Sequence, residues 1–271
     1  MDIYLQEYNA DEAVARYTSR TAGSGIGYLL ENDYAEVYLS AISDFLRVRS
    51  ERPLRLLEFG CGGGMNIITL LKLLERRGRS IELAIGADFS QKLILAAQDE
   101  SRSLLDRAQQ EKMHFALARN ETIAADLRRA LNGSAGELEN SFHLILGVNT
   151  FRYCHRLGKA RDCARDLATL LAPGAICIIV DMNRRFPAFR SRFRDRRTKP
   201  EAERYLPSLD EYAAPFEESG LEVLRKETFC WIPHSAGARL TRFCHLLTPV
   251  LNLFAKPMAM RSLVISRKRL L

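Results

Sequence analysis

The chain has 271 residues, of which 47% are hydrophobic and 27% are charged. This length and apolar content suffice for one large domain with a substantial core, and they exclude wholesale disorder. The net charge is +7, but much of it falls between Arg184 and Lys199. The charge therefore predicts one local basic surface rather than a basic protein as a whole.

The six cysteines are scattered, without a CxxC pair, and the five histidines are dispersed. This distribution excludes a disulfide framework and predicts no metal site, and it fits the reducing cytosol, so we expect a cytoplasmic protein. The N-terminus lacks the pattern of a signal peptide, so we expect the mature chain to be the whole chain. The longest apolar run, Leu246 to Ala255, is short and contains Pro249, which argues against a membrane span.

The first segment with a clear pattern is a helix from Tyr34 to Leu46, where apolar residues recur at helical spacing behind Asn32 and Asp33. A shorter helix is predicted around Asp11 to Tyr17, and a glycine-rich turn follows it. Residues 1–50 are therefore predicted to form an N-terminal helical cap on the rest of the chain.

The body of the chain alternates short apolar runs with helical patterns, which predicts an α/β fold with a parallel sheet and crossover helices. The predicted strands are Leu54 to Phe59, Ile81 to Ala87, Met113 to Leu117, Phe142 to Val148, Ala175 to Val180, Leu221 to Trp231 and Arg261 to Arg267. The predicted helices are Met65 to Arg76, one from about Gln91, Lys159 to Leu171 and Leu209 to Ser219. A turn is expected at Pro173-Gly174.

Two insertions interrupt this alternation, and neither is large enough to be an independent domain. Residues 183–200 form a basic lid or loop after the fifth strand, and residues 233–260 precede the last strand and are expected to contain helix. We therefore predict a single domain over residues 1–271.

The most informative motif is E-x-G-x-G-x-G, formed by Glu58, Gly60, Gly62 and Gly64 between an apolar strand and a helix. Glycines permit a tight turn and let a ligand approach the backbone, while the following helix offers free N–H groups. A nucleoside ligand at the strand ends is the expected occupant.

The second strand delivers a carboxylate beside this turn, because it ends at Asp88, which is followed by Phe89 and Ser90. A carboxylate there can accept hydrogen bonds from both ribose hydroxyls. The alternative is that Asp88 or Ser90 only caps the next helix.

The spacing of the glycines distinguishes two nucleotide-binding families. A dinucleotide fingerprint needs Gly or Ala where this chain has Met65. The spacing instead resembles the first motif of the class I S-adenosylmethionine-dependent methyltransferases, and the resemblance extends over LLEFGCGGG, IGADFS, FHLILGVNTFRYCHRL, LLAPGAICIIVDMN and RSLVISRK. It implies a Rossmann-like seven-stranded sheet, mostly parallel with an antiparallel last strand, and helices on both faces.

The resemblance also implies S-adenosyl-L-methionine as cofactor, with a binding role for ten residues. Glu58 would face the amino acid portion of the cofactor, the turn of Gly60, Cys61, Gly62 and Gly64 would face its backbone, and Asp88 would face its ribose. Asn120 would lie near the adenine, Asn149 and Thr150 would touch the methionine part, and Phe89 would also contact the cofactor. The chain departs from the family at two places. It has Ala118, Arg119, Asn120 and Glu121 where an acidic residue is frequent near the adenine, and Phe142-His143 where Phe-Asp is frequent.

Three side chains are candidate catalytic groups: His155, Tyr153 and His234. An imidazole ordinarily titrates near neutral pH, and His155 follows the fourth strand, so His155 suits the role of general base. Local hydrogen bonding of His155 and aromatic packing of Tyr153 are the alternatives. Asp181 and Asn183 are further polar groups expected at the open sheet edge. Methyl transfer from a sulfonium is a direct displacement, so alignment of donor and acceptor can supply most of the catalysis without an essential base.

The expected partner is a small-molecule acceptor, anionic or lipophilic. The segment from Arg184 to Lys199 has eight Arg or Lys residues, one acid and three phenylalanines. It suits RNA, an anionic membrane surface or an anionic acceptor, with a solvated loop as the alternative. Nucleic acid is disfavoured, since no RNA-binding module is visible. The insertion 233–260 would add an apolar wall for a lipophilic acceptor. The alternative is that its apolar residues simply form core beneath a surface helix.

Two rival functions remain open from the sequence. An NAD(P)-dependent oxidoreductase is disfavoured by Met65 and by the lack of a Tyr-x-x-x-Lys pair. A methyltransferase-like protein that binds the cofactor without transferring methyl shares the fold.

Overall fold

The computed structural model describes residues 40, 42–44, 52–132, 137–189, 205–232 and 238–270. Of the predicted N-terminal cap, Ser40 and residues 42–44 are helical, within the helix expected from Tyr34 to Leu46. Ile42 is 2% exposed and packs in the apolar cluster on one face of the sheet. The rest of the cap, and residues 190–200 of the predicted lid, lie outside the described residues.

Seven strands form one sheet in the order β3-β2-β1-β4-β5-β7-β6. All neighbouring pairs from β3 to β5 are parallel, and β7 is antiparallel to both β5 and β6. The strands are β1 (Leu54–Phe59), β2 (Ile81–Asp88), β3 (Met113–Leu117), β4 (Phe142–Val148), β5 (Leu171–Met182), β6 (Leu221–Phe229) and β7 (Arg261–Lys268). This confirms the predicted Rossmann-like sheet with its antiparallel last strand.

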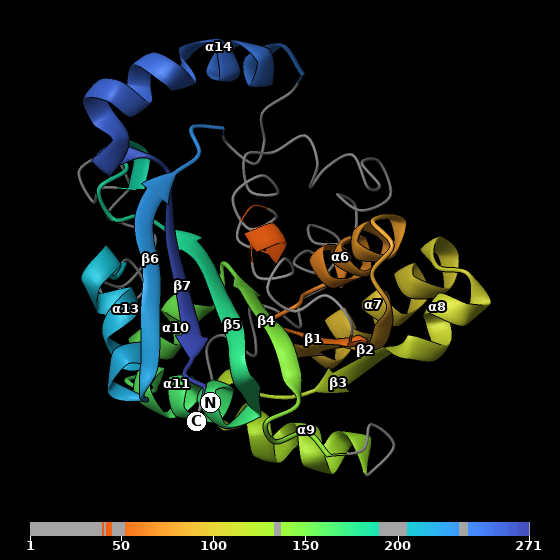
Figure 1. Ribbon diagram of the computed structural model, residues 1–271. Coiled ribbons are helices and arrows are strands. Elements are labelled where there is room, and N and C mark those ends of the chain that lie inside the picture. Colours follow the sequence, from red (N-terminus) through yellow and green to blue (C-terminus); the bar gives the residue numbers. More distant parts are fainter. Residues whose placement is uncertain are drawn as a thin grey trace.

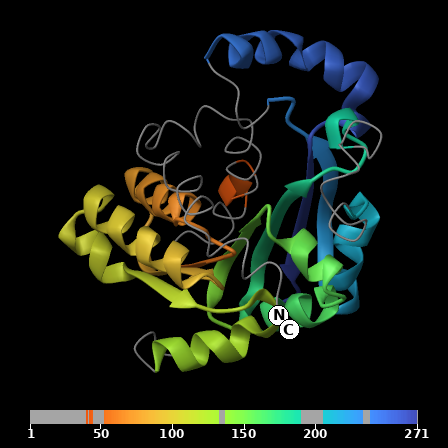
Figure 2. The same cartoon turned by 180° about the vertical axis from the view of Figure 1, so that it is seen from behind.

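Helices cover both faces of the sheet (Figures 1 and 2). One face carries α6 (Met65–Arg76) and α7 (Gln91–Leu104), and the other carries α9 (Ile123–Leu131), α10 (Phe151–Arg156), α11 (Ala160–Leu170) and α13 (Leu209–Glu218). The remaining elements are α8 (Arg107–Lys112), α14 (Ala238–Ala255) and the short 3₁₀ helices η1 (Asn120–Thr122), η2 (Pro187–Phe189) and η4 (Lys256–Met258).

Strand periodicity explains how one sequence supplies both apolar layers. Along β1, Leu57 and Phe59 belong to one buried cluster, while Leu54 and Leu56 belong to the cluster on the opposite face. A strand covered on both faces is apolar throughout rather than alternating. Because β1, β2, β4 and β5 run parallel to one another, their carboxyl ends meet at one edge of the sheet.

The boundary between α11 and β5 differs from the prediction. The sequence predicts a helix to Leu171 and a strand from Ala175, whereas α11 ends at Leu170 and β5 begins at Leu171. Leu171 is buried and already pairs with Phe142 of β4. The predicted turn at Pro173-Gly174 is therefore an irregularity inside the strand, with Gly174 at φ +73° and a shift in register to the next pair.

The sequence prediction omitted α8 and α9. Both are short, and α8 has no buried residue, so neither shows a long apolar period. Asp106 begins α8 with a capping box, in which its side chain accepts a hydrogen bond from Gln109 N and the Gln109 side chain accepts one from Asp106 N. This cap is a sequence signal that would have located α8.

The insertion before β7 contains the helix α14, as expected for residues 233–260, and η4 follows it. Figure 1 shows α14 beyond the end of β6, outside the two helical layers. Among its described side chains none is buried, and those of Cys244, Leu247 and Leu251 are half-buried. In the described part of the chain, no helix is long and apolar enough to cross a membrane.

Candidate functional site

The glycine turn joins β1 to α6, and three of its four glycines have left-handed backbones, with φ of +61° at Gly60, +54° at Gly62 and +77° at Gly64. The space around them differs. A Cβ at Gly60 would lie 2.0 Å from Thr150 Oγ1, and a Cβ at Gly64 would lie 2.8 Å from the Phe115 ring. At Gly62 no atom lies within 4 Å of that position. Protein packing therefore explains Gly60 and Gly64, while Gly62 faces open space.

Glu58 holds the start of α6 in place. Its carboxylate is fully buried and accepts hydrogen bonds from Asn66 Nδ2 at 2.7 Å and from the main-chain N–H of Ile67 at 2.9 Å. Burial raises the pKa of Glu58 to about 8, although both hydrogen bonds oppose that rise. In this structure Glu58 contacts the chain itself, so its predicted cofactor contact stays a prediction.

Asp88 joins the end of β2 to the same turn. It is 4% exposed, and its Oδ2 accepts a hydrogen bond from Gly62 N while Oδ1 accepts one from Ser90 N, each at 2.9 Å. Burial raises the pKa of Asp88, and the main-chain donors Ser90, Gly62 and Phe89 oppose this. Ser90 caps α7 by accepting from Leu93 N at 3.4 Å, so capping is done by the serine rather than by Asp88.

Cys61 ties the turn to β2 through the backbone. Its N–H donates to Ala87 O and its carbonyl accepts from Gly64 N, both at 2.9 Å. The side chain is buried, and burial raises the pKa of the thiol well above its usual value. Cys61 therefore has the properties of a packed structural thiol rather than a reactive one.

Asn120, Thr150 and Gly60 connect three strand ends. Asn120, in η1 after β3, is 7% exposed and donates from Nδ2 to Thr150 Oγ1 at 2.8 Å. Thr150 follows β4 and packs against Gly60 after β1. The structure thus brings together the residues that the resemblance assigned to the adenine and methionine parts of a cofactor.

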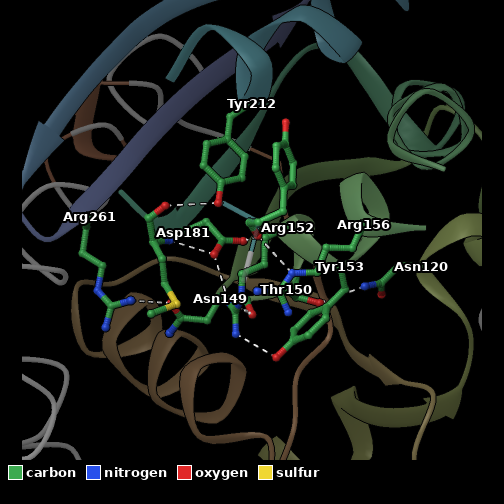
Figure 3. Close-up of polar contacts among 11 residues, drawn as sticks. Asn120, Asn149, Thr150, Arg152, Tyr153, Arg156, Asp181, Tyr212 and Arg261 are labelled. Carbon is green, nitrogen blue, oxygen red and sulfur yellow. Dashed lines mark hydrogen bonds and ion pairs between the residues drawn. The ribbon is translucent and has the colours of Figure 1, made fainter. Parts of the chain in front are cut away.

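A buried polar network lies beside this site, at the ends of β4, β5 and β7 (Figure 3). Fully buried Asp181 accepts hydrogen bonds from Arg152 N and Arg152 Nη1, each at 2.9 Å. Arg152 also donates to the carbonyl of Asn149 and, at 2.8 Å, to Tyr153 Oη. Arg261, 2% exposed at the start of β7, donates to Asn149 Oδ1 at 2.6 Å.

This network includes two residues that the sequence prediction missed, Arg152 and Arg261. Asn149 has a left-handed backbone, with φ of +56°, and receives hydrogen bonds from both arginines. The pair Asn149 and Arg261 is separated by 112 residues. Only the position of Arg152 near Asn149 and Thr150 offered a local signal in the sequence.

The three catalytic candidates have different surroundings. The ring of His155 packs edge-to-face against Phe151 and Tyr212, with centroids 5.1 and 5.5 Å apart, and burial lowers its pKa. Its Nε2 is buried without a hydrogen-bond partner among the described residues. The guanidinium carbon of Arg152 lies over the Tyr153 ring, 4.4 Å from the centroid of that ring. His234 lies outside the described residues.

The departure at Phe142-His143 lies far from the carboxyl ends of the strands, because it opens β4. There His143 Nδ1 accepts a hydrogen bond from Arg55 N at 3.1 Å. His143 therefore links β4 to β1 at the opposite edge of the sheet. The described residues contain no group of His, Cys, Asp and Glu side chains that could hold a metal ion.

The residues at the turn fit a nucleoside cofactor. Gly62 leaves open the volume that a side chain would fill, and the buried Asp88 carboxylate lies directly beside it. Carboxylate oxygens accept several hydrogen bonds each, so Asp88 keeps acceptor capacity for hydroxyl groups after its main-chain contacts.

Comparison with known proteins supports this geometry. A family model described as a methyltransferase domain matches residues 30–237. No curated protein is significantly similar to the chain in sequence.

Three solved structures illustrate the shared fold. Phosphoethanolamine N-methyltransferase 2 of Haemonchus contortus, solved with S-adenosyl-L-methionine, has a TM-score of 0.60 at 12% identity, covering 99% of this chain and 59% of that one. Magnesium protoporphyrin IX methyltransferase from Synechocystis PCC 6803 has a TM-score of 0.55 at 12% identity, covering 98% and 95%. Geranyl diphosphate C-methyltransferase from Streptomyces coelicolor A3(2) has a TM-score of 0.52 at 12% identity, covering 85% and 79%.

The family match covers most of the chain and decides between the two enzyme families that the glycine spacing compared. The sheet order and the glycine turn agree with it. The chain therefore belongs to the methyltransferase domain family and is a class I S-adenosylmethionine-dependent methyltransferase.

Proposed function

We propose that this protein transfers a methyl group from S-adenosylmethionine to a small-molecule or lipid-like acceptor, on an oxygen, nitrogen or carbon atom. The observation that carries the proposal is Gly62, which faces open space while its N–H is held by the buried carboxylate of Asp88. A nucleoside needs this combination of an accessible backbone and a fixed acceptor.

The residues at the turn have distinct roles in this proposal. Asp88 accepts hydrogen bonds from the ribose hydroxyls, and Asn120 lies on the adenine side. Asn149 and Thr150 contact the methionine part, while Glu58 orders the first turn of α6. The bound cofactor supplies a methyl group on a positively charged sulfur. The protein's task is then to align the acceptor atom with that methyl group and to exclude water.

The acceptor is proposed to meet this methyl group near the buried polar network formed by Asp181, Arg152 and Tyr153. Three of the similar structures are named as enzymes of phosphoethanolamine, magnesium protoporphyrin IX and geranyl diphosphate, while another is a methyltransferase in complex with its activator Trm112. The three named acceptors are small molecules, and they support the proposal of a small-molecule acceptor here. Tyr153, His155 and His234 remain the proposed proton-accepting groups, and Asp181 holds Arg152 and thereby Tyr153 in position.

Two measurements test the proposal. Calorimetric titration of the purified protein should show binding of S-adenosylmethionine and of its demethylated product, but not of NADH or NADPH. Incubation with cofactor labelled on its methyl group, together with extracts of small molecules, should release the demethylated product and a labelled acceptor. Binding of a nicotinamide dinucleotide in place of S-adenosylmethionine would contradict the assignment, and binding without turnover would favour a non-catalytic role.

A further inference from the structure

Helix α14 turns an apolar face toward solvent. Its outward residues recur at helical spacing and are between 55% and 80% exposed. They are Phe243, Leu246, Val250, Leu253 and Phe254. A contiguous exposed patch of large apolar side chains marks a surface that binds something.

The contacts on the other side of α14 orient this face. Cys244 is half-buried and packs against the apolar cluster on one face of the sheet. Asn252 Oδ1 accepts a hydrogen bond from Trp231 Nε1 at 2.8 Å. The half-buried side of α14, which carries Cys244, Leu247 and Leu251, therefore faces the body of the protein, and the exposed apolar face points away from it.

The charge on this helix has one sign. Arg239 and Arg242 are exposed in its first two turns, and the sequence from Pro233 to Arg261 contains no Asp or Glu. An exposed apolar face bordered by arginines, without acids, is the pattern of a helix that lies in the interface of a membrane with anionic lipids.

We propose that α14 is an interfacial helix that docks this protein on an anionic phospholipid bilayer. The exposed Phe and Leu side chains enter the boundary between headgroups and acyl chains, and Arg239 and Arg242 contact the phosphates. A second copy docked through the same face fits less well, because it would add further arginines without any Asp or Glu from residues 233–261 to pair with them.

The exit of α14 links the proposed surface to the edge of the sheet where Asp181 lies. The carbonyls of Pro257, in η4, and of Ala259, just after it, accept hydrogen bonds from Asn183 Nδ2 at 3.0 and 2.6 Å. Asn183 follows β5, two residues after Asp181. A bilayer at α14 would therefore lie near the carboxyl ends of the strands. The docking surface does not depend on the proposed methyl transfer.

The test is flotation of the full chain with vesicles of phosphatidylcholine, with and without phosphatidylglycerol. The variant Leu246→Glu/Leu253→Glu changes two side chains that are each 76% exposed, so the fold should be unaffected. The matched control, Leu95→Glu/Leu224→Glu, adds the same charge at residues 50% and 45% exposed on α7 and β6. Affinity of each variant for S-adenosylmethionine, measured separately, reports on the cofactor site.

The wild type and the control should float with the anionic vesicles, and the α14 variant should bind them at least about tenfold more weakly, because two apolar side chains no longer enter the bilayer. Arg239→Gln/Arg242→Gln should weaken binding only to the anionic vesicles. Equal binding by the α14 variant and the control would overturn the proposal. So would a wild type that ignores vesicles but forms a dimer that Leu246→Glu/Leu253→Glu dissociates.

Discussion

At the scale of single residues, Gly60, Gly62 and Gly64 of the turn share a left-handed backbone but differ in what surrounds them. Gly60 and Gly64 lack room for a side chain because Thr150 and Phe115 fill the space. Gly62 has that room, so only its position beside Asp88 suggests that a ligand occupies it. The same residue type in one motif therefore answers two different physical requirements.

Gly62→Val should lower affinity for S-adenosylmethionine at least about tenfold, because its side chain would project into the space proposed for the nucleoside. The matched control is Gly78→Val, since Gly78 has φ of +74° and also no atom within 4 Å. Both variants should lose about 1–2 kcal/mol of stability from left-handed backbone strain. Calorimetry on the folded variants separates the two effects. Normal binding by Gly62→Val would remove the basis for the assigned cofactor site.

Asp88→Ala should weaken cofactor binding by about 1.5–3 kcal/mol, as expected for hydrogen bonds to a charged group. The control is Asp106→Ala, which also removes a carboxylate that accepts a main-chain hydrogen bond, but at the start of α8. Asp106→Ala should cost about 1 kcal/mol of stability and leave affinity unchanged. If Asp88→Ala behaves like Asp106→Ala, Asp88 only supports the turn.

The raised pKa of Glu58 predicts a pH dependence of stability. In the folded protein Glu58 holds its proton up to about pH 8, whereas its ordinary pKa is 4.5. Between these values the folded state binds more protons than the unfolded state, so stability falls as pH rises, by up to about 1.4 kcal/mol per pH unit. Below pH 4.5 this contribution is fully present, and above about pH 8 it is lost.

Urea unfolding of the wild type and of Glu58→Gln at several pH values between 5 and 8 measures this contribution. The stability of the wild type relative to the variant should decline steadily across that range, because glutamine has no proton to lose. A difference that stays constant with pH would show that Glu58 is ionised throughout.

At the scale of elements, α10 is positioned by one buried ion pair. Arg152, in its first turn, binds Asp181 at the end of β5 through both its main-chain N–H and its guanidinium. The same guanidinium fixes Tyr153 and the carbonyl of Asn149. The geometry of the chain after β4 therefore depends on a carboxylate from the neighbouring strand.

Arg152→Ala should destabilise the protein by about 3–5 kcal/mol, because it leaves the Asp181 carboxylate buried and without its guanidinium partner. Arg128→Ala on α9 is the control. Its partner Glu139 and Arg128 itself have side chains 41% and 58% exposed, so the loss should be below about 1 kcal/mol. Urea unfolding compares the two variants. Similar small losses would mean that water reaches Asp181.

At the scale of the whole molecule, the site draws on strand ends that are distant in sequence. Asp88 comes from β2, Asn120 follows β3, Thr150 follows β4 and Arg261 opens β7. The unfolded chain does not bring these residues together, so a ligand that contacts them binds only the folded state. Its binding should therefore raise the free energy of global unfolding.

Adding S-adenosylmethionine at about 100 times its dissociation constant should therefore raise the free energy of unfolding by about 2.7 kcal/mol. Urea unfolding with and without the cofactor measures this. Asp88→Ala should need a higher cofactor concentration for the same gain. An unchanged unfolding midpoint at saturating cofactor would indicate that the bound site unfolds locally.

The sequence alone determined the order of strand, glycine turn, helix and acid, because each of these signals is local. Apolar runs define the bounds of β1 and β4. The spacing of Gly60, Gly62 and Gly64 lies within five consecutive residues, so it can be recognised without knowing any distant contact. The family resemblance then predicted the antiparallel last strand, which the pairing of β7 with β5 and β6 confirms.

The tertiary structure decided which polar groups meet. Arg152 with Asp181, and Asn149 with Arg261, are pairs separated by 29 and 112 residues, and no periodicity in the chain links them. It also decided that the apolar face of α14 points outward and that β5 begins before Pro173-Gly174. These features depend on packing between distant segments, and a hydrogen-bond partner or an exposed face exists only once those segments are assembled.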